Sequence, residues 1–211
     1  VDARGHGDST APPGDGAYTW SAMARDLAAV AQAVCALARA PRIALGVGHS
    51  FGGTLTMTAA SLQPGLYERA MLVDPVILPK RLVAQRAAAG ENPMAERARK
   101  RRHVWASRDE ALAFFADKPL FERFTERALR LYVEEALRET ASGDVELKCA
   151  GRVEAAIFAG SIDFDPMEVA EGADLPLRVV RATRGDFTRE AYEELVAALP
   201  RGELGEIEGG H

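Results

Sequence analysis

The stretch Ile43-Ala44-Leu45-Gly46-Val47-Gly48-His49-Ser50-Phe51-Gly52-Gly53 is the most informative part of the chain. It opens as a short apolar run, passes through Gly48-x-Ser50-x-Gly52 and continues into a segment compatible with a helix. A strand, a sharp turn and a helix in that order hold a serine in a strained conformation, with its hydroxyl at the top of a sheet. We expect a Cβ at Gly48 or Gly52 to crowd this turn. A glycine-rich loop could carry the same letters, but the flanking strand and helix favour Ser50 as a nucleophile.

Further apolar runs predict a sheet around this strand. Residues 69–73 form a short strand that stops at Pro75, residues 177–182 follow Pro176, and residues 203–207 form a weak strand near the end. A strand, helix and strand as compact as residues 43–75 require parallel pairing and a right-handed crossover. Helices are expected after Thr19, over residues 54–62 and over residues 189–199.

The pattern changes between residues 78 and 172, where strand signals vanish and charged residues and helix formers dominate. We expect helices near residues 93–105, 107–116, 125–140 and 153–158. Ser107 and Thr125 are suitable N-caps. The chain is therefore divided into a first core part (1–77), an inserted helical cap (78–172) and a second core part (173–211).

Three motifs resemble those of the α/β-hydrolase superfamily in both order and spacing. They are Asp2-x-Arg4-Gly5-His6-Gly7-Asp8-Ser9, Gly48-His49-Ser50-Phe51-Gly52 and Gly209-Gly210-His211. The resemblance covers nearly the whole chain. It implies an α/β fold with a parallel-rich sheet, helices on both faces and an inserted helical cap. It also implies that the first motif leaves the fourth strand of the family, so that the N-terminal strands are missing from these 211 residues.

The same resemblance implies a catalytic triad of serine, acid and histidine. Ser50 is the candidate nucleophile and His211 the candidate base. Asp186 follows the penultimate strand, where most of the family place the acid, and we take it as the first candidate. Asp74 is the alternative, because it ends the strand after the nucleophile helix, a position that some lipases and dehalogenases use. The backbone N–H of Phe51 is one expected oxyanion donor, and the second is expected outside this chain.

The composition of the chain limits the classes of binding partner that we expect. The formal net charge is −5 and the sequence pI is about 5.5, so binding of nucleic acid is not expected. Cys35 and Cys149 are far apart in the sequence, which predicts two free thiols in a reduced compartment and no metal-binding or redox pair. No cofactor is expected. We find neither a signal peptide nor a run that could cross a bilayer, and we therefore expect a cytoplasmic protein without a membrane partner. No pattern indicates an oligomeric state.

These features favour a cofactor-free serine hydrolase. The substrate would be an ester, thioester, lactone or activated C–C bond of a small, partly apolar molecule, with specificity set by the cap. The alternatives are a non-catalytic ligand-binding protein on a hydrolase scaffold, or an inactive fragment. The remaining histidines suggest no role in this chemistry: His49 is the variable residue of the turn, His6 lies in a turn motif and His103 ends a basic run.

Overall fold

The computed structural model describes residues 1–78, 85, 88, 92–161 and 164–211, which form two compact units. One unit combines Val1–Tyr18 with Asn92–Ala159, and the other combines Thr19–Glu91 with Gly160–His211. The first 18 residues therefore group with the expected cap segment, and residues 160–172 group with the core. The expected cap also includes residues 79–84, 86–87, 89–91 and 162–163, which lie outside the described residues.

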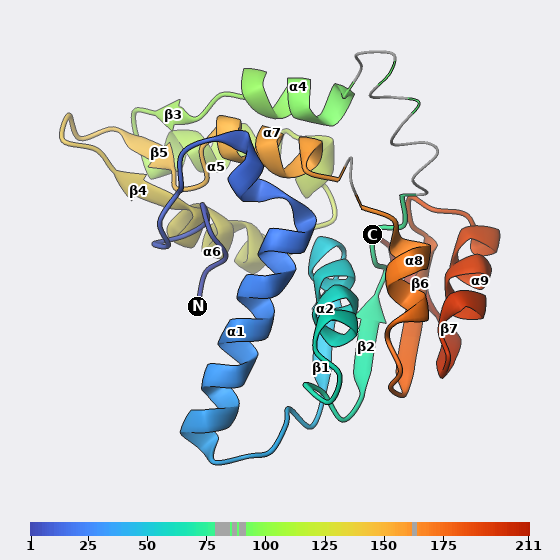
Figure 1. Cartoon of the computed structure of the whole chain (residues 1–211). Helices are drawn as coiled ribbons and strands as arrows, with labels where there is room; N and C mark the ends of the chain where they lie inside the picture. The colour runs from blue at the N-terminus through green and yellow to red at the C-terminus, as the bar shows by residue number, and fades with distance from the viewer. Residues whose placement is uncertain (79–84, 86–87, 89–91, 162–163) are drawn as a thin grey trace. The chain divides into compact units, whose positions relative to one another are not determined.

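A four-stranded parallel sheet forms the centre of the second unit (Figure 1). Its order is β1 (Gly46–His49), β2 (Ala70–Val73), β6 (Leu177–Arg184) and β7 (Gly202–Gly210), and each neighbouring pair runs parallel. The predicted α/β class is confirmed. The strand predicted at residues 43–47 begins later, because Ile43 makes only an isolated bridge to Tyr67.

Within the described residues, the helices that accompany this sheet are α1 (Trp20–Ala38), α2 (Phe51–Leu62), α8 (Pro166–Glu171) and α9 (Arg189–Ala198). Helix α2 packs on β1 and β2, and α9 packs on β6 and β7. The helix predicted after Thr19 is confirmed, and the Thr19 hydroxyl caps it by accepting from Ala22 N. The core between these elements includes Met57, Leu72, Val179, Tyr192 and Leu195, each almost completely buried.

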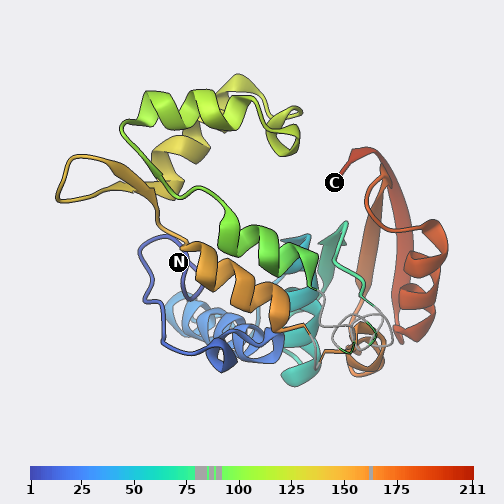
Figure 2. The same cartoon turned by 90° about the horizontal axis from the view of Figure 1, so that it is seen from above.

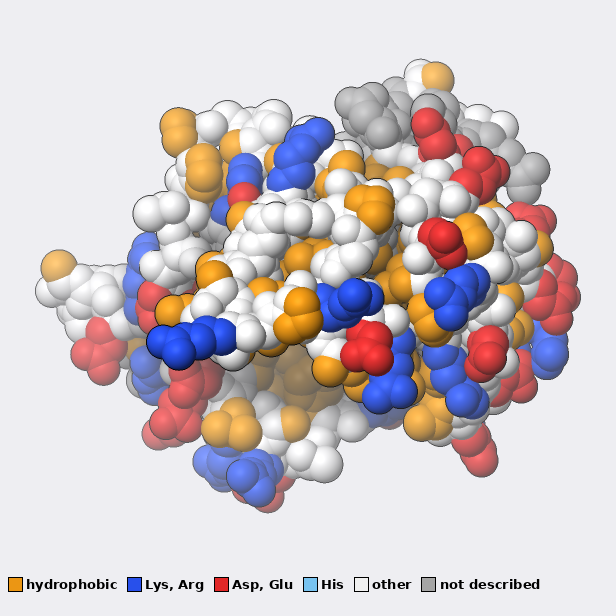
Figure 3. Space-filling view, turned by 60° about the horizontal axis from the view of Figure 1, so that its bottom comes forward, with side chains coloured by type: hydrophobic (Ala, Val, Ile, Leu, Met, Phe, Trp, Pro, Cys, Tyr) orange, Lys and Arg blue, Asp and Glu red, His pale blue; other side chains and the backbone are white. Residues whose placement is uncertain are grey.

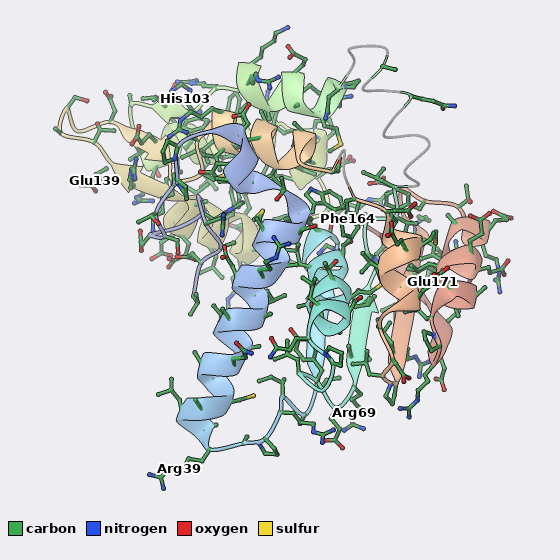
Figure 4. All side chains as sticks on the ribbon, viewed as in Figure 1. Arg39, Arg69, His103, Glu139, Phe164 and Glu171 are labelled. Carbon is green, nitrogen blue, oxygen red and sulfur yellow. The ribbon has the colours of Figure 1, made fainter. Side chains whose placement is uncertain are left out.

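Helix α1 differs from one expectation. By length and composition alone it could cross a membrane, so the prediction that no run reaches this threshold is wrong. Met23, Ala24, Ala28 and Ala31 are nevertheless buried, and α1 packs against α2. The helix ends at Arg39 in a left-handed conformation, and Figure 4 shows Arg39 pointing away at that end. Apolar residues of α1 are thus buried against the rest of the protein, as in a core helix.

The other unit contains the predicted helices together with strands that were not predicted. Its helices are α4 (Pro93–Lys100), α5 (Arg108–Ala116), α6 (Glu126–Ala136) and α7 (Gly151–Ala159), with short 3-10 turns η1 (Asp15–Tyr18) and η2 (Pro119–Phe121). Figure 2 shows α4 and α7 side by side. Ser107 accepts from Glu110 N at 3.1 Å and Thr125 accepts from Ala128 N at 3.2 Å, so both predicted caps are confirmed.

A small antiparallel sheet corrects the expectation that this segment has no strands. It consists of β3 (Val104–Trp105), β5 (Val145–Leu147) and β4 (Leu137–Glu139), in that order. Two of the predicted helices end early as a result. Strands of two or three residues are too short to show alternation in a sequence, yet each buries an apolar side chain in the core of this unit: Trp105, Val145 and Leu137.

The surface shows no field of a single sign on the face drawn in Figure 3, where acidic and basic side chains are interspersed. This agrees with the modest net charge of −5. The expectation that nucleic acid is not a partner stays a prediction.

Candidate active site

The sharp turn between β1 and α2 holds Ser50 in a strained conformation. Its φ of 54° and ψ of −127° are rare for a residue with a side chain. A Cβ on Gly48 would collide with the carbonyl oxygen of Gly52, so the requirement for glycine at 48 is confirmed. The same prediction for Gly52 is wrong, because a Cβ there meets no atom within 4 Å. The second close approach belongs to Gly53, whose added Cβ would lie 3.0 Å from Gly48 O.

Ser50, His211 and Asp74 form a continuous chain of hydrogen bonds. Ser50 Oγ lies 2.7 Å from His211 Nε2, and His211 Nδ1 lies 2.5 Å from Asp74 Oδ2. Both nitrogens of the imidazole are therefore engaged. All three residues belong to the second unit.

Strand pairing explains why these residues meet. His49 of β1 pairs with Val73 of β2, and Ser50 and Asp74 each follow directly. His211 follows β7, which runs parallel to the other strands. The carboxyl ends of parallel strands lie at the same edge of a sheet, so the three side chains converge there.

The prediction that Asp186 contacts the imidazole is wrong. Asp186 is exposed in the turn after β6, and within the described part of the chain it makes no hydrogen bond to His211. Asp74, the alternative, occupies the position beside Nδ1. The turn after β6 passes close to Asp74, since a Cβ on Gly185 would lie 2.7 Å from Asp74 Oδ2.

Asp74 is a buried carboxylate with several donors. Its side chain is 2% exposed, and Oδ1 accepts from Ala182 N at 2.8 Å and from the Tyr192 hydroxyl at 2.7 Å. Burial by itself raises the pKa of Asp74, but the hydrogen bonds from Ala182, Tyr192 and His211 together hold the pKa below its ordinary value. The group therefore remains ionised at neutral pH. An ionised carboxylate at Nδ1 favours the tautomer whose Nε2 accepts the serine proton.

Two neighbours of the site were missed from the sequence. Tyr192 lies in the helix predicted over residues 189–199, and no role was predicted for it from the sequence. A buried tyrosine hydroxyl needs a hydrogen-bond partner, and that need is a signal that could have identified it. His49 was passed over as the variable residue of the turn. Its Nε2 lies 3.0 Å from the backbone oxygen of His211, and the two rings are 4.9 Å apart. The sequence offers no signal for that contact across 162 positions.

Phe51 is the first residue of α2, where a backbone N–H has no acceptor within the helix. It is therefore available to an oxyanion at Ser50. The Phe51 ring packs 4.8 Å from Trp20, which in turn lies 5.2 Å from Phe164, labelled in Figure 4. The second donor, expected outside this chain, stays a prediction. Among the residues that the structure describes, no cluster of three or more histidine, cysteine or acidic side chains could hold a metal.

Comparison with known proteins identifies the fold of the whole chain. A sequence model described as the alpha/beta hydrolase family matches residues 1–211. No match was found among curated proteins.

Solved structures agree with this match. The peroxisomal alpha-beta-hydrolase Lpx1 from Saccharomyces cerevisiae superposes with a TM-score of 0.82 at 19% identity, covering 100% of this chain and 60% of Lpx1. E-2-(acetamidomethylene)succinate hydrolase gives 0.73 at 22% identity, with 99% and 72% covered. The esterase Rv0045c from Mycobacterium tuberculosis gives 0.73 at 22% identity, with 100% and 69% covered. At these identities the likeness shows the fold alone.

Proposed function

The chain belongs to the alpha/beta hydrolase family, and from that premise we propose that it is a serine hydrolase with Ser50 as nucleophile, His211 as base and Asp74 as acid. The observation that carries this proposal is the hydrogen-bond chain from Ser50 Oγ to His211 and on to Asp74, with distances of 2.7 and 2.5 Å. The substrate class is an ester, thioester, lactone or activated C–C bond of a small, partly apolar molecule, and no cofactor takes part.

The proposed mechanism follows from this geometry. For an ester, the Ser50 oxygen attacks the carbonyl carbon while His211 Nε2 takes the hydroxyl proton. Asp74 stabilises the imidazolium that forms, and the Phe51 N–H donates to the developing oxyanion. The imidazolium then protonates the leaving alcohol, which leaves an acyl group on Ser50. Water, deprotonated by His211, attacks the carbonyl carbon of this acyl group. The bond from that carbon to Ser50 Oγ then breaks, the imidazolium returns its proton to Ser50 Oγ, and the free acid departs.

The names of structurally similar proteins support acyl chemistry on this fold by analogy. They include an esterase, a thioesterase domain and a deformylase of N-formylmaleamic acid. Those activities belong to those proteins, because one fold carries many substrates. The choice of substrate is assigned to the inserted cap predicted at residues 78–172.

A fluorophosphonate probe tests the nucleophile directly. We expect covalent labelling at a single site and its loss in Ser50→Ala, since the probe reacts with a serine activated by a base. Ser142→Ala is the matched control, because Ser142 is an exposed serine that hydrogen-bonds Asp144 and has no hydrogen bond to a histidine in the described part of the chain. Labelling that persists in Ser50→Ala would reject the proposal.

A panel of esters with varied acyl length then separates the enzyme from the alternative function. Turnover that depends on Ser50 supports the hydrolase. A chain that binds these esters saturably, is not labelled and does not release acid would instead be a ligand-binding protein on a hydrolase scaffold.

A further inference from the structure

We propose that Tyr192 is a positioning residue of this site, because its hydroxyl fixes the Asp74 carboxylate that in turn holds His211. The hydroxyl donates to Asp74 Oδ1 at 2.7 Å, while Asp74 Oδ2 contacts His211 Nδ1 at 2.5 Å. The inference rests on the proposed function and adds a fourth residue to its hydrogen-bond chain.

Two donors from different elements define the plane of the carboxylate. Ala182 N on β6 donates to Oδ1 at 2.8 Å, and Tyr192 donates to the same oxygen from α9. Rotation about the last torsion of an aspartate is otherwise broad. With Tyr192 in place, Oδ2 stays aimed at the imidazole.

Tyr192 is itself held rigidly. Its side chain is completely buried in the apolar cluster that includes Leu72, Val179 and Leu195. The Phe187 ring packs edge-on at 6.4 Å. Because the Tyr192 ring is fixed by this packing, its hydroxyl cannot move with the Asp74 carboxylate. The hydroxyl therefore sets the position of the carboxylate.

The Tyr192 hydroxyl keeps its proton over the pH range in which the proposed triad would act, so it remains a hydrogen-bond donor. Burial raises its pKa strongly, and the hydrogen bond and negative charge of Asp74 raise it further. Arg181 acts in the opposite direction and Asp186 adds to the rise. Around the imidazole itself, His49 lies beside the ring of His211. Tyr192 therefore donates a hydrogen bond and does not exchange a proton.

Tyr18 provides a matched comparison. It is equally buried, and its hydroxyl donates to the carbonyl oxygen of Pro12 at 2.9 Å. Removing either hydroxyl deletes one hydrogen bond from a core tyrosine. Only Tyr192 bonds a residue of the proposed triad.

The first measurement is the rate at which fluorophosphonate labels Ser50 in the 211-residue chain, corrected for the folded fraction. We expect Tyr192→Phe to label about ten-fold more slowly, as the loss of a hydrogen bond to a charged group predicts. Tyr18→Phe should stay within about two-fold of the wild type. If Tyr192→Phe fails to fold, 4-fluorophenylalanine at position 192 fills the volume of the hydroxyl without donating, and 4-aminophenylalanine restores a donor.

The second measurement needs no reaction at Ser50. Proton NMR observes the imidazole Nδ1 proton of His211, which the contact with Asp74 protects from exchange. We expect the signal in the wild type, in Tyr18→Phe and with 4-aminophenylalanine at 192, and its loss by exchange in Tyr192→Phe or with 4-fluorophenylalanine.

The outcomes separate the two proposals. Slow labelling, a lost Nδ1 signal and recovery with the amino analogue support a positioning role. Tyr192 variants that label at the wild-type rate and keep the signal overturn it. A wild type that is not labelled, or is labelled equally in Ser50→Ala, rejects the proposed function, and the Nδ1 proton then decides the role of Tyr192 alone.

Discussion

At the scale of single residues, the two candidate aspartates, Asp74 after β2 and Asp186 in the turn after β6, differ in their surroundings. Asp74 has a positive φ of 45°, is buried and accepts hydrogen bonds on both oxygens. Asp186 is exposed. A carboxylate that orients an imidazole must be held, which is true of Asp74 alone.

We therefore expect Asp74→Asn to slow the reaction of Ser50 by about a hundred-fold to ten-thousand-fold, since an amide at Nδ1 favours the wrong tautomer. Asp186→Asn should stay within about two-fold of the wild type, as surface changes usually do. The measurement is turnover of a cleaved ester, or the labelling rate, at equal folded protein. The reverse ranking would return the acid to Asp186.

Sequence alone predicted part of this site. Ser50 could be predicted because a strained turn requires glycines near the serine, and this requirement is visible in the local sequence. His211 was predicted from the terminal Gly-Gly-His. Asp74 and Tyr192 follow from contacts that span more than 100 positions, such as the 118 between them. Both aspartates lie after a strand, so spacing could not choose between them.

At the scale of elements, β1 forms one edge of the sheet. Among the described residues it pairs only with β2, and Val47 is 60% exposed. Leu45, just before the strand, is 44% exposed. An apolar edge with free N–H and C=O groups is a template for association with another chain.

Val47→Lys should raise the highest protein concentration at which the 211-residue chain is still monomeric, because a lysine on an edge strand opposes pairing with a strand of another chain. Val179→Lys on β6 is the contrasting variant and should prevent folding, since Val179 is completely buried. Light scattering against concentration gives the measurement. An unchanged onset of association in Val47→Lys would contradict this prediction.

Helices were easier to predict than strands. Thr19, Ser107 and Thr125 mark helix starts because an N-cap hydroxyl is a local requirement. Strands β3, β4 and β5 depend on one another for hydrogen bonds, and their lengths of two or three residues leave no periodic signal. The absence of strand signals over residues 78–172 was therefore misleading.

At the scale of the whole molecule, the chain has separate cores in its two units. Leu137 is buried with Trp105 and Phe115 in one, and Leu72 with Val179 in the other. Each unit also contains one of the two tryptophans, Trp105 and Trp20. The stability of each unit can thus be followed by its own fluorescence.

Leu137→Ala and Leu72→Ala form a matched pair, because both leucines are almost fully buried. Each should lower the free energy of unfolding of its own unit by about 2–5 kcal/mol. The measurement is a urea titration followed by tryptophan fluorescence. In a Trp20→Phe background, Leu137→Ala should shift the unfolding transition reported by Trp105. In a Trp105→Phe background, Leu72→Ala should shift the unfolding transition reported by Trp20. Equal shifts at both tryptophans would show a single cooperative unit.

The grouping of Val1–Tyr18 with Asn92–Ala159 could not be predicted from composition. Tyr18, Val153 and Gly5 are close enough that a Cβ on Gly5 would lie 2.5 Å from Val153 and 3.0 Å from the Tyr18 ring. No local sequence pattern predicts a contact between segments so far apart in the chain. The boundary was drawn where composition changed, and tertiary contacts divide the chain differently.

The tilted contact between the Trp20 and Phe51 rings has a practical consequence for finding substrates. Phe51 directly follows Ser50, the proposed nucleophile, so the Trp20 indole lies one aromatic contact away from the residue after Ser50. In a Trp105→Phe background, the intensity and wavelength of the remaining emission form an optical readout of this neighbourhood. Compound libraries can then be screened by fluorescence titration, without a chromogenic leaving group.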